Sequence, residues 1–216
     1  MVKLVIFDCD GTLVDGQHLI LDSMQTASKY CNIAYPGDEA VRQIVGLSLL
    51  EAISLVYPGE NDKIHRQLQE AFITRFQEIR RLEQDHEPLF DGVVEALIRL
   101  NDEGYLLGVA TGKSRRGLEM TLKNHDLGQY FVTLNTADDG PGKPHPSMVD
   151  NAMKDVGAVP ENTAMIGDTS YDMLMAKAAN VKAIGVDWGY HSFETLEQSG
   201  ADHVLDHISK IHQIID

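Results

Sequence analysis

The chain has 216 residues, of which 43% are hydrophobic and 24% are charged. This is the composition of an ordinary globular protein, and it excludes a disordered or fibrous chain. Lysine and arginine total 18 against 33 aspartates and glutamates, a formal net charge of −15, so nucleic acids and anionic membranes are not expected partners.

Short runs of β-branched and apolar residues recur along the chain and predict strands. The first run spans residues 2–8 and ends in charged side chains. A run that is apolar on both faces is typical of a strand buried in a parallel sheet. The runs that share this pattern, the last of them weakly, are Leu106–Thr111, Phe131–Asn135, Thr163–Asp168, Val181–Val186 and Ala201–Asp206.

Helical patterns lie between the later strands. Ser114 is a suitable N-cap for one of them, and another begins at Pro146 and stops at Gly157, which is the usual asymmetry of helix ends. The alternation of strands and helices beyond residue 104 predicts right-handed βαβ units and a parallel sheet. The predicted helices are Val93–Asn101, Ser114–His125, Pro146–Val156 and Tyr171–Ala179.

Residues 17–85 break this alternation because they carry no convincing strand pattern. Pro-Gly pairs at Pro36 and Pro58 divide the stretch. Three helices are predicted in it: Leu19–Cys31, Asp38–Val56 and Asp62–Leu82.

These elements predict an α/β protein with a Rossmann-like parallel sheet core and an inserted, all-helical domain. The core would be formed by residues 1–15 and 88–216, and the insert by residues 16–87. The expected boundaries are Asp15-Gly16 and Glu87–Gly92, where glycines and a proline can act as hinges.

Polar residues with catalytic potential follow the predicted strands. The first strand ends in Asp8-Cys9-Asp10-Gly11-Thr12, the second in Thr111-Gly112-Lys113, and a later one in Gly167-Asp168. Lys143 lies in a Gly/Pro-rich loop that leads into a helix. Ligands of an open parallel sheet bind outside the carboxyl ends of its strands, so we expect these four segments to converge at one edge.

Three aspartates at this edge predict a metal site. Asp8 and Asp10 are two residues apart and point the same way in an extended segment, and Asp168 would join them. Carboxylates ~4 Å apart repel each other by about 4 kcal/mol per pair at an effective dielectric constant near 20. The cluster therefore implies a bound cation or raised pKa values, and all-oxygen ligands beside phosphate favour Mg²⁺.

The neighbouring residues are suited to a phosphate group. Thr111, Gly112 and Lys143 can hold phosphate oxygens, and Gly11 lets the backbone approach an anion closely, so that successive N–H groups cradle it.

In order and placement, these residues resemble the four motifs of the haloacid dehalogenase superfamily. The resemblance covers essentially the whole chain, because the helical insert stands where many members carry a helical cap. Val45–Ala52 and Lys143–Pro146 are similar to segments of the phosphoglycolate-phosphatase-like branch. The four motifs are Asp8-x-Asp10-Gly11-Thr12, Thr111, Lys143 and Gly167-Asp168-x-x-x-Asp172.

The resemblance implies catalysis through an aspartyl-phosphate. Asp8 would be the nucleophile. Asp10 would protonate the leaving alkoxide and then activate water. Thr111 and Lys143 would hold the phosphoryl group and offset its charge.

The resemblance also implies the ligands of the metal. Mg²⁺ would be bound by Asp8, the backbone carbonyl of Asp10 and Asp168. Asp172 would not bind the metal but would support these ligands, through water or through Lys143. The helical cap would close over the site and exclude bulk water.

The sequence therefore predicts a Mg²⁺-dependent phosphatase that acts on a small phosphorylated metabolite, with phosphoglycolate as one candidate. A sugar-phosphate phosphomutase is one alternative, although Leu49 and Leu50 follow Ser48 where such enzymes tend to place an arginine. A receiver-like phospho-aspartate signalling domain is the second alternative, since it is also doubly wound. The helical insert and Asp10 argue against it.

The remaining features give general expectations. Two cysteines, Cys9 and Cys31, cannot form a disulfide framework, and the first apolar run is too short for a secretory signal. We expect a cytoplasmic monomer or small homo-oligomer.

Lys113 is expected in solvent, with a place near the phosphate as the alternative. The arginines of the insert could contact substrate, but all except one are expected on solvated helix faces: Arg42, Arg75, Arg80 and Arg81.

Overall fold

The computed structural model describes residues 3–82 and 87–215. Its described strands form one sheet of six parallel strands in the order β3-β2-β1-β4-β5-β6. The chain runs outward from β1 to β3, returns to β4 beside β1, and then runs outward on the other side. This is the doubly wound order of a Rossmann-like fold, so the predicted α/β class is confirmed. The strands are β1 (Leu4–Phe7), β2 (Leu106–Ala110), β3 (Phe131–Asn135), β4 (Thr163–Gly167), β5 (Lys182–Val186) and β6 (His203–Leu205).

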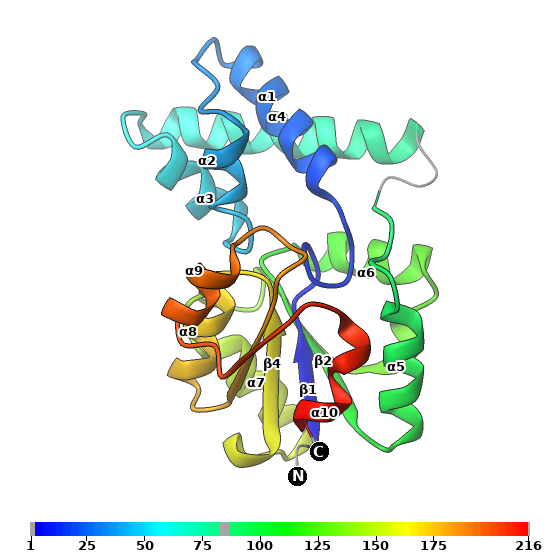
Figure 1. Cartoon of the computed structure of the whole chain (residues 1–216). Helices are drawn as coiled ribbons and strands as arrows, with labels where there is room; N and C mark the ends of the chain where they lie inside the picture. Colours follow the sequence, from blue (N-terminus) through cyan, green and yellow to red (C-terminus); the bar gives the residue numbers. More distant parts are fainter. Residues whose placement is uncertain (1–2, 83–86, 216) are drawn as a thin grey trace.

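Helices cover both faces of the sheet and its upper edge (Figure 1). None of those in the described ranges is long and apolar enough to cross a membrane. The α-helices are α1 (Gln17–Tyr30), α2 (Asp38–Arg42), α3 (Leu49–Val56), α4 (Asp62–Leu82), α5 (Val93–Asp102), α6 (Arg115–Asn124), α7 (Ser147–Val156), α8 (Ser170–Ala178), α9 (Phe193–Gln198) and α10 (His212–Ile215).

The central strand β1 shows why the sheet is covered on both sides. Its side chains alternate between the two faces, and all of them are fully buried. Val5 and Phe7 join an apolar cluster with α5, α6 and the C-terminal segment. Leu4 and Ile6 join a second cluster with α7, α8 and α9. Burial on both faces explains the continuous apolar run in the sequence.

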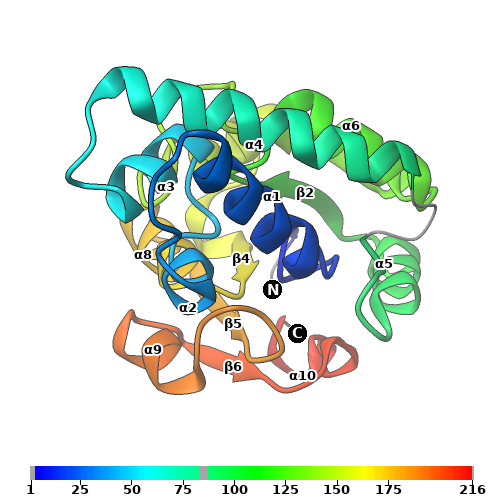
Figure 2. The ribbon, with the colours of Figure 1, turned by 90° about the horizontal axis from the view of Figure 1, so that it is seen from above.

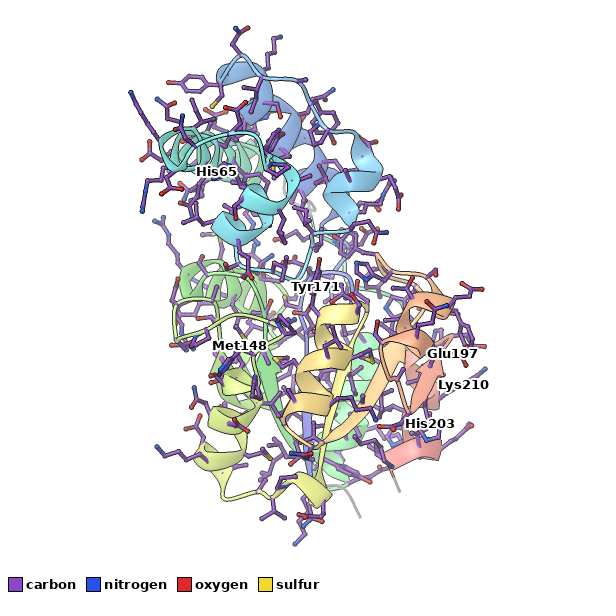
Figure 3. The ribbon with its side chains drawn as sticks, turned by 90° about the vertical axis from the view of Figure 1, so that its left-hand side faces the viewer. His65, Met148, Tyr171, Glu197, His203 and Lys210 are labelled. Carbon is purple, nitrogen blue, oxygen red and sulfur yellow. The ribbon has the colours of Figure 1, made fainter. Side chains whose placement is uncertain are left out.

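The helices α1 to α4 form a separate layer beyond the carboxyl ends of the strands, and α1 lies along α4 (Figures 1 and 2). This helical layer has its own apolar cluster, which includes Met24, Ile53, Leu68 and Phe72. Tyr171, at the start of α8, lies where the two layers meet (Figure 3) and packs against that cluster from the sheet side.

Two neighbouring chain segments connect the helical layer to the sheet. Val14 and Leu89 form an antiparallel bridge. The Asp15 N–H donates to the Pro88 carbonyl at 2.8 Å, and the Phe90 N–H donates to the Leu13 carbonyl at 3.0 Å. The chain therefore enters and leaves the helical layer through a paired crossing.

The structure corrects one predicted element. A single helix over Asp38–Val56 is wrong, because residues 43–48 between α2 and α3 are not helical. Gly46 has a φ of 99°, which glycine adopts without strain and which ends helical geometry. Ser48 is extended and precedes α3 as its N-cap residue. The other predicted helices and strands lie within a few residues of their expected bounds. The predicted first strand, core and insert include residues 1–2, 83–86 or 216, and these parts of the predictions lie outside the described residues.

Adjacent residues of α5 test the packing of the sheet. Leu97 is fully buried and Ile98 is 40% exposed. We expect Leu97→Ala to lower the free energy of unfolding by about 2–5 kcal/mol, because it removes packed methyl groups and leaves a cavity. The matched change Ile98→Ala should cost less than about 1 kcal/mol. Urea denaturation followed by circular dichroism measures both, and equal losses would contradict this packing.

Candidate active site

The aspartates predicted at the strand ends meet where the chain changes direction between β1 and β4. Asp8 directly follows β1 and Asp168 directly follows β4, while Asp172 lies in the first turn of α8. Each offers a carboxylate oxygen within 4.8 Å of the others, and each side chain is at most 1% exposed. Loops diverge at such a switch point and leave a crevice for a ligand.

Hydrogen bonds fix two of these carboxylates. Asp168 accepts from the Thr12 hydroxyl and from the Tyr190 N–H, both at 2.9 Å. Asp172 accepts from the Thr169 N–H at 3.0 Å and from the Thr169 hydroxyl at 2.7 Å, a capping box at the start of α8. Both orientations are therefore set by local structure.

Lys143 joins the same cluster. Its ammonium nitrogen lies 2.9 Å from Asp8 Oδ1 and 2.7 Å from Asp172 Oδ1, and its side chain is fully buried. The contact between Lys143 and Asp172 is one of the two that the resemblance implied for Asp172, the other being through water. When all three carboxylates are ionised, the ammonium group of Lys143 offsets only one of them and leaves a formal excess charge of −2.

Burial, more than the neighbouring charges, raises the pKa values of Asp8 and Asp168. Burial raises the pKa of Asp8 to about 6, although Lys143 opposes the shift. Burial, together with Asp8 and Asp172 nearby, raises the pKa of Asp168 well above its ordinary value. A divalent cation bound by carboxylate oxygens would neutralise the excess charge. The donor set therefore fits a hard ion such as Mg²⁺.

The predicted phosphate-binding residues border the cluster. Thr111 directly follows β2, is 1% exposed, and faces the same cavity as Asp8, Asp10 and Gly112. Lys143 is not among the residues that line this cavity; it reaches the site through Asp8.

Two glycines are required by close contacts. Gly11 has a φ of 82°, and a Cβ atom there would collide with the carboxylate of Asp168. A Cβ atom on Gly112 would collide with the carbonyl groups of Gly46 and Leu47, which belong to the helical layer. The helical layer thus rests directly on the loop that follows Thr111.

Asp10 is held by a cation that the sequence did not assign to the site. Both carboxylate oxygens of Asp10 accept from Lys113 Nζ, at 2.6 and 2.8 Å. Lys113 Nζ also lies 2.9 Å from Glu87 Oε1, and the Lys113 side chain is only 8% exposed. The expectation that Lys113 lies in solvent is wrong, because two carboxylates stabilise its buried charge.

The ion-pair chain continues into the helical layer. Arg80 of α4 pairs with Glu87 Oε2 and donates to the Thr121 hydroxyl of α6 at 2.7 Å. Arg80 is thus one arginine of the insert that is buried rather than solvated. Together with Asp10 and Lys113, it completes a chain of four charges, Arg80–Glu87–Lys113–Asp10. Their side chains are at most 14% exposed, and the two cations balance the two carboxylates.

Sequence reasoning missed Glu87 as a functional residue because no motif surrounds it. Lys113 stands two residues after Thr111, and this spacing was the one signal in the sequence that could have placed Lys113 at the site. Burial alone would raise the pKa of Glu87, but Lys113 and Arg80 overcome that effect and hold the pKa at about 2. Glu87 therefore stays ionised and joins the charges on either side.

We expect Glu87→Gln to lower the free energy of unfolding at pH 7 by about 3 kcal/mol, since it leaves buried cations unmatched. A carboxylate whose pKa is lowered from 4.5 to about 2 contributes stability above pH 4.5 that disappears as the pH falls toward 2. The difference between the two proteins should therefore be smaller at pH 3 than at pH 7. Urea denaturation at the two pH values measures it.

Glu95→Gln is the matched control, because Glu95 lies on the exposed face of α5. It should change the free energy of unfolding by less than about 0.5 kcal/mol at either pH. Glu87→Gln behaving like this control would contradict the structural role of the chain of four charges.

Comparisons with known proteins agree with this geometry. A family model described as haloacid dehalogenase-like hydrolase matches residues 5–186. A protein of Dickeya dadantii (strain 3937) named "Probable phosphatase IndB" is 37% identical over 217 residues, which cover 98% of this chain and 92% of that protein. "Pyrophosphatase PpaX" of Bacillus mycoides (strain KBAB4) is 32% identical over 219 residues, covering 99% and 97%.

A solved structure shares the fold. The crystal structure of a predicted phosphoglycolate phosphatase from Haemophilus somnus 129PT aligns with a TM-score of 0.86 over 100% of this chain and 98% of that one, at 23% identity. The whole described chain, helical layer included, thus has a counterpart of the same architecture.

Proposed function

The chain belongs to the haloacid dehalogenase-like hydrolase family and is a hydrolase of phosphate esters, and we propose that it hydrolyses monoesters of small molecules through Asp8. The observation that carries this proposal is the position of Asp8, in contact with Lys143 inside a buried cluster of excess charge −2. Such a cluster can take up a divalent metal and a phosphoryl group at the same edge of the sheet.

Mg²⁺ is the proposed metal, held by Asp8, Asp168 and the backbone carbonyl of Asp10. Asp172 is already occupied by Lys143 and by both donors of Thr169, which fits it for support rather than ligation. The metal, when bound, supplies positive charge beside the phosphoryl oxygens.

In the first proposed step, an oxygen of Asp8 attacks the phosphorus atom and the bond from phosphorus to the ester oxygen breaks. Asp10, after it has taken up a proton from solvent, gives that proton to the departing alkoxide. In the structure both oxygens of Asp10 accept from Lys113, so proton transfer requires this ion pair to loosen when substrate is bound.

In the second proposed step, water attacks the phosphorus atom while Asp10 takes its proton. The bond between phosphorus and Asp8 breaks, which releases inorganic phosphate and restores the carboxylate. Thr111 and Lys143 hold the phosphoryl oxygens and offset their charge in both steps.

The helical layer is proposed to act as a cap, with residues 16–87 as the cap and residues 1–15 and 88–216 as the core. The Tyr171 hydroxyl donates to the carbonyl of Gln43 in the helical layer at 3.1 Å, and Gly112 lies against the same segment. These contacts would keep bulk water away during phosphoryl transfer. A cytoplasmic location and a monomer or small homo-oligomer stay predictions from the sequence.

Phosphate release is expected to depend on Asp8. Asp8→Asn should lower kcat/KM for phosphate monoesters by at least about a thousandfold in the presence of Mg²⁺, because the nucleophile is lost. A phosphate-release assay on a panel that includes phosphoglycolate and pyrophosphate measures it. Asp187→Asn is a matched control, since Asp187 follows β5 but is exposed.

Analysis of the products and of the protein after the same reactions, with sugar phosphates added to the panel, separates the alternatives. Isomerised product without free phosphate would indicate the phosphomutase, and a long-lived aspartyl-phosphate without turnover would indicate the receiver-like domain. Unchanged turnover in Asp8→Asn would contradict the nucleophile assignment.

Metal binding is expected to depend on pH. Because the pKa of Asp8 rises from 3.8 to about 6 in the fold, the metal-free protein loses stability as the pH rises through this window. Mg²⁺ should therefore raise the Tm by several degrees at pH 7.5 and by less at pH 5, where protons compete. Differential scanning calorimetry of the wild type and Asp168→Asn tests this, since the variant should respond little at either pH.

A further inference from the structure

A cavity of about 470 Å³ lies between the helical layer and the carboxyl ends of the strands. Asp8, Asp10 and Thr111 lie at its sheet side. The volume falls inside the range of about 300–1,000 Å³ that is usual for small-molecule sites. A phosphoryl group on Asp8 would fill only part of it, so the rest is available to the alcohol portion of a substrate.

The walls of the remaining space are mainly apolar. Leu47 comes from the segment that contacts Gly112, and Leu50 lies in the first turn of α3. The α4 helix contributes Phe72, Ile73 and Phe76. The rings of Phe72 and Phe76 stack at 5.7 Å between centroids with an interplanar angle of 19°. A flat, apolar group placed against these side chains would be removed from water.

In the part of the chain that the structure describes, the two buried cations at this cavity are already paired with carboxylates. Arg80 is paired with Glu87, and Lys113 is paired with both Glu87 and Asp10. Arg81 and Arg116, which also line the cavity, are exposed. Among the described lining residues, no buried cation is therefore free to receive a second anionic group.

A second anion in this space would be unfavourable for a further reason. Burying a charge against the apolar walls without a partner carries a large desolvation penalty. Phosphoglycolate and pyrophosphate both bring such a second charge beside the phosphoryl group that is transferred.

We propose that the substrate is a phosphate monoester whose alcohol portion is uncharged, mainly apolar and larger than glycolate. This proposal rests on the proposed phosphatase function. The phosphatase function depends on the residues that hold the phosphoryl group, whereas this proposal depends on the residues that line the space for the leaving alcohol.

Phenylethyl phosphate and phosphoglycolate are a matched pair of probes, since both are esters of primary alcohols. With Mg²⁺, kcat/KM for phenylethyl phosphate should exceed that for phosphoglycolate by about tenfold or more, and pyrophosphate should be poorer still. A higher value for phosphoglycolate or pyrophosphate would overturn the proposed substrate class and leave the phosphatase function in place.

Leu50→Arg tests the apolar wall directly. Leu50 is half-buried, lines the cavity and lies outside the apolar cluster of the helical layer. The added cation should lower the preference for phenylethyl phosphate over phosphoglycolate by about tenfold. Leu55→Arg is the matched control, because Leu55 lies on the same helix and is 56% exposed; it should leave the preference unchanged. An equal effect of both variants would overturn the proposal.

A binding measurement separates the two levels of the argument. Isothermal titration calorimetry of Asp8→Asn with each ester, in the presence of Mg²⁺, reports the preference without turnover. Phosphate release from none of the esters by the wild type would overturn the phosphatase function. Tighter binding of phenylethyl phosphate would then still support the substrate class, and tighter binding of phosphoglycolate would overturn it.

Discussion

The structure depends on matching the charge of carboxylates that are buried at one edge of a parallel sheet. Asp8 and Asp168 lie there because β1 and β4 end side by side. Ionised carboxylates that are this close together and shielded from water repel each other strongly. The surrounding residues must therefore offset their negative charge. One compensation is built in, since Lys143 contacts Asp8 and Asp172. The excess of −2 that remains is the physical basis for a divalent cation.

The second set of buried charges has a different consequence. The chain Arg80–Glu87–Lys113–Asp10 is neutral, so it needs no ion from outside. Its members come from α4, from the crossing between the layers and from loops that follow β2 and β1. A displacement of α4 relative to the sheet would separate Arg80 from Thr121 of α6 and alter the partners of Glu87 and Lys113. The position of the helical layer and the environment of Asp10 are therefore physically linked.

Features of the fold and the site that depend on local patterns could be predicted from the sequence. Features that depend on contacts between residues distant in sequence could not. The strand runs and the aspartates that end them have periodic or positional signals, and the structure brings Asp8, Asp168 and Lys143 together. Glu87 and Arg80 carry no motif; their pairing arises because the C-terminal end of α4 contacts α6. The burial of Lys113 likewise depends on Glu87, which is distant in sequence.

The one predicted helix that proved wrong shows how the fold makes room for a substrate. Had Asp38–Val56 been a single helix, the apolar residues of 43–48 would have been spread around its surface. The positive φ of Gly46 instead turns this segment toward the sheet, where its carbonyl groups meet Gly112. Leu47 then faces the cavity above Asp8. The same backbone turn that seats the helical layer on the catalytic edge therefore also gives the space beside it an apolar wall.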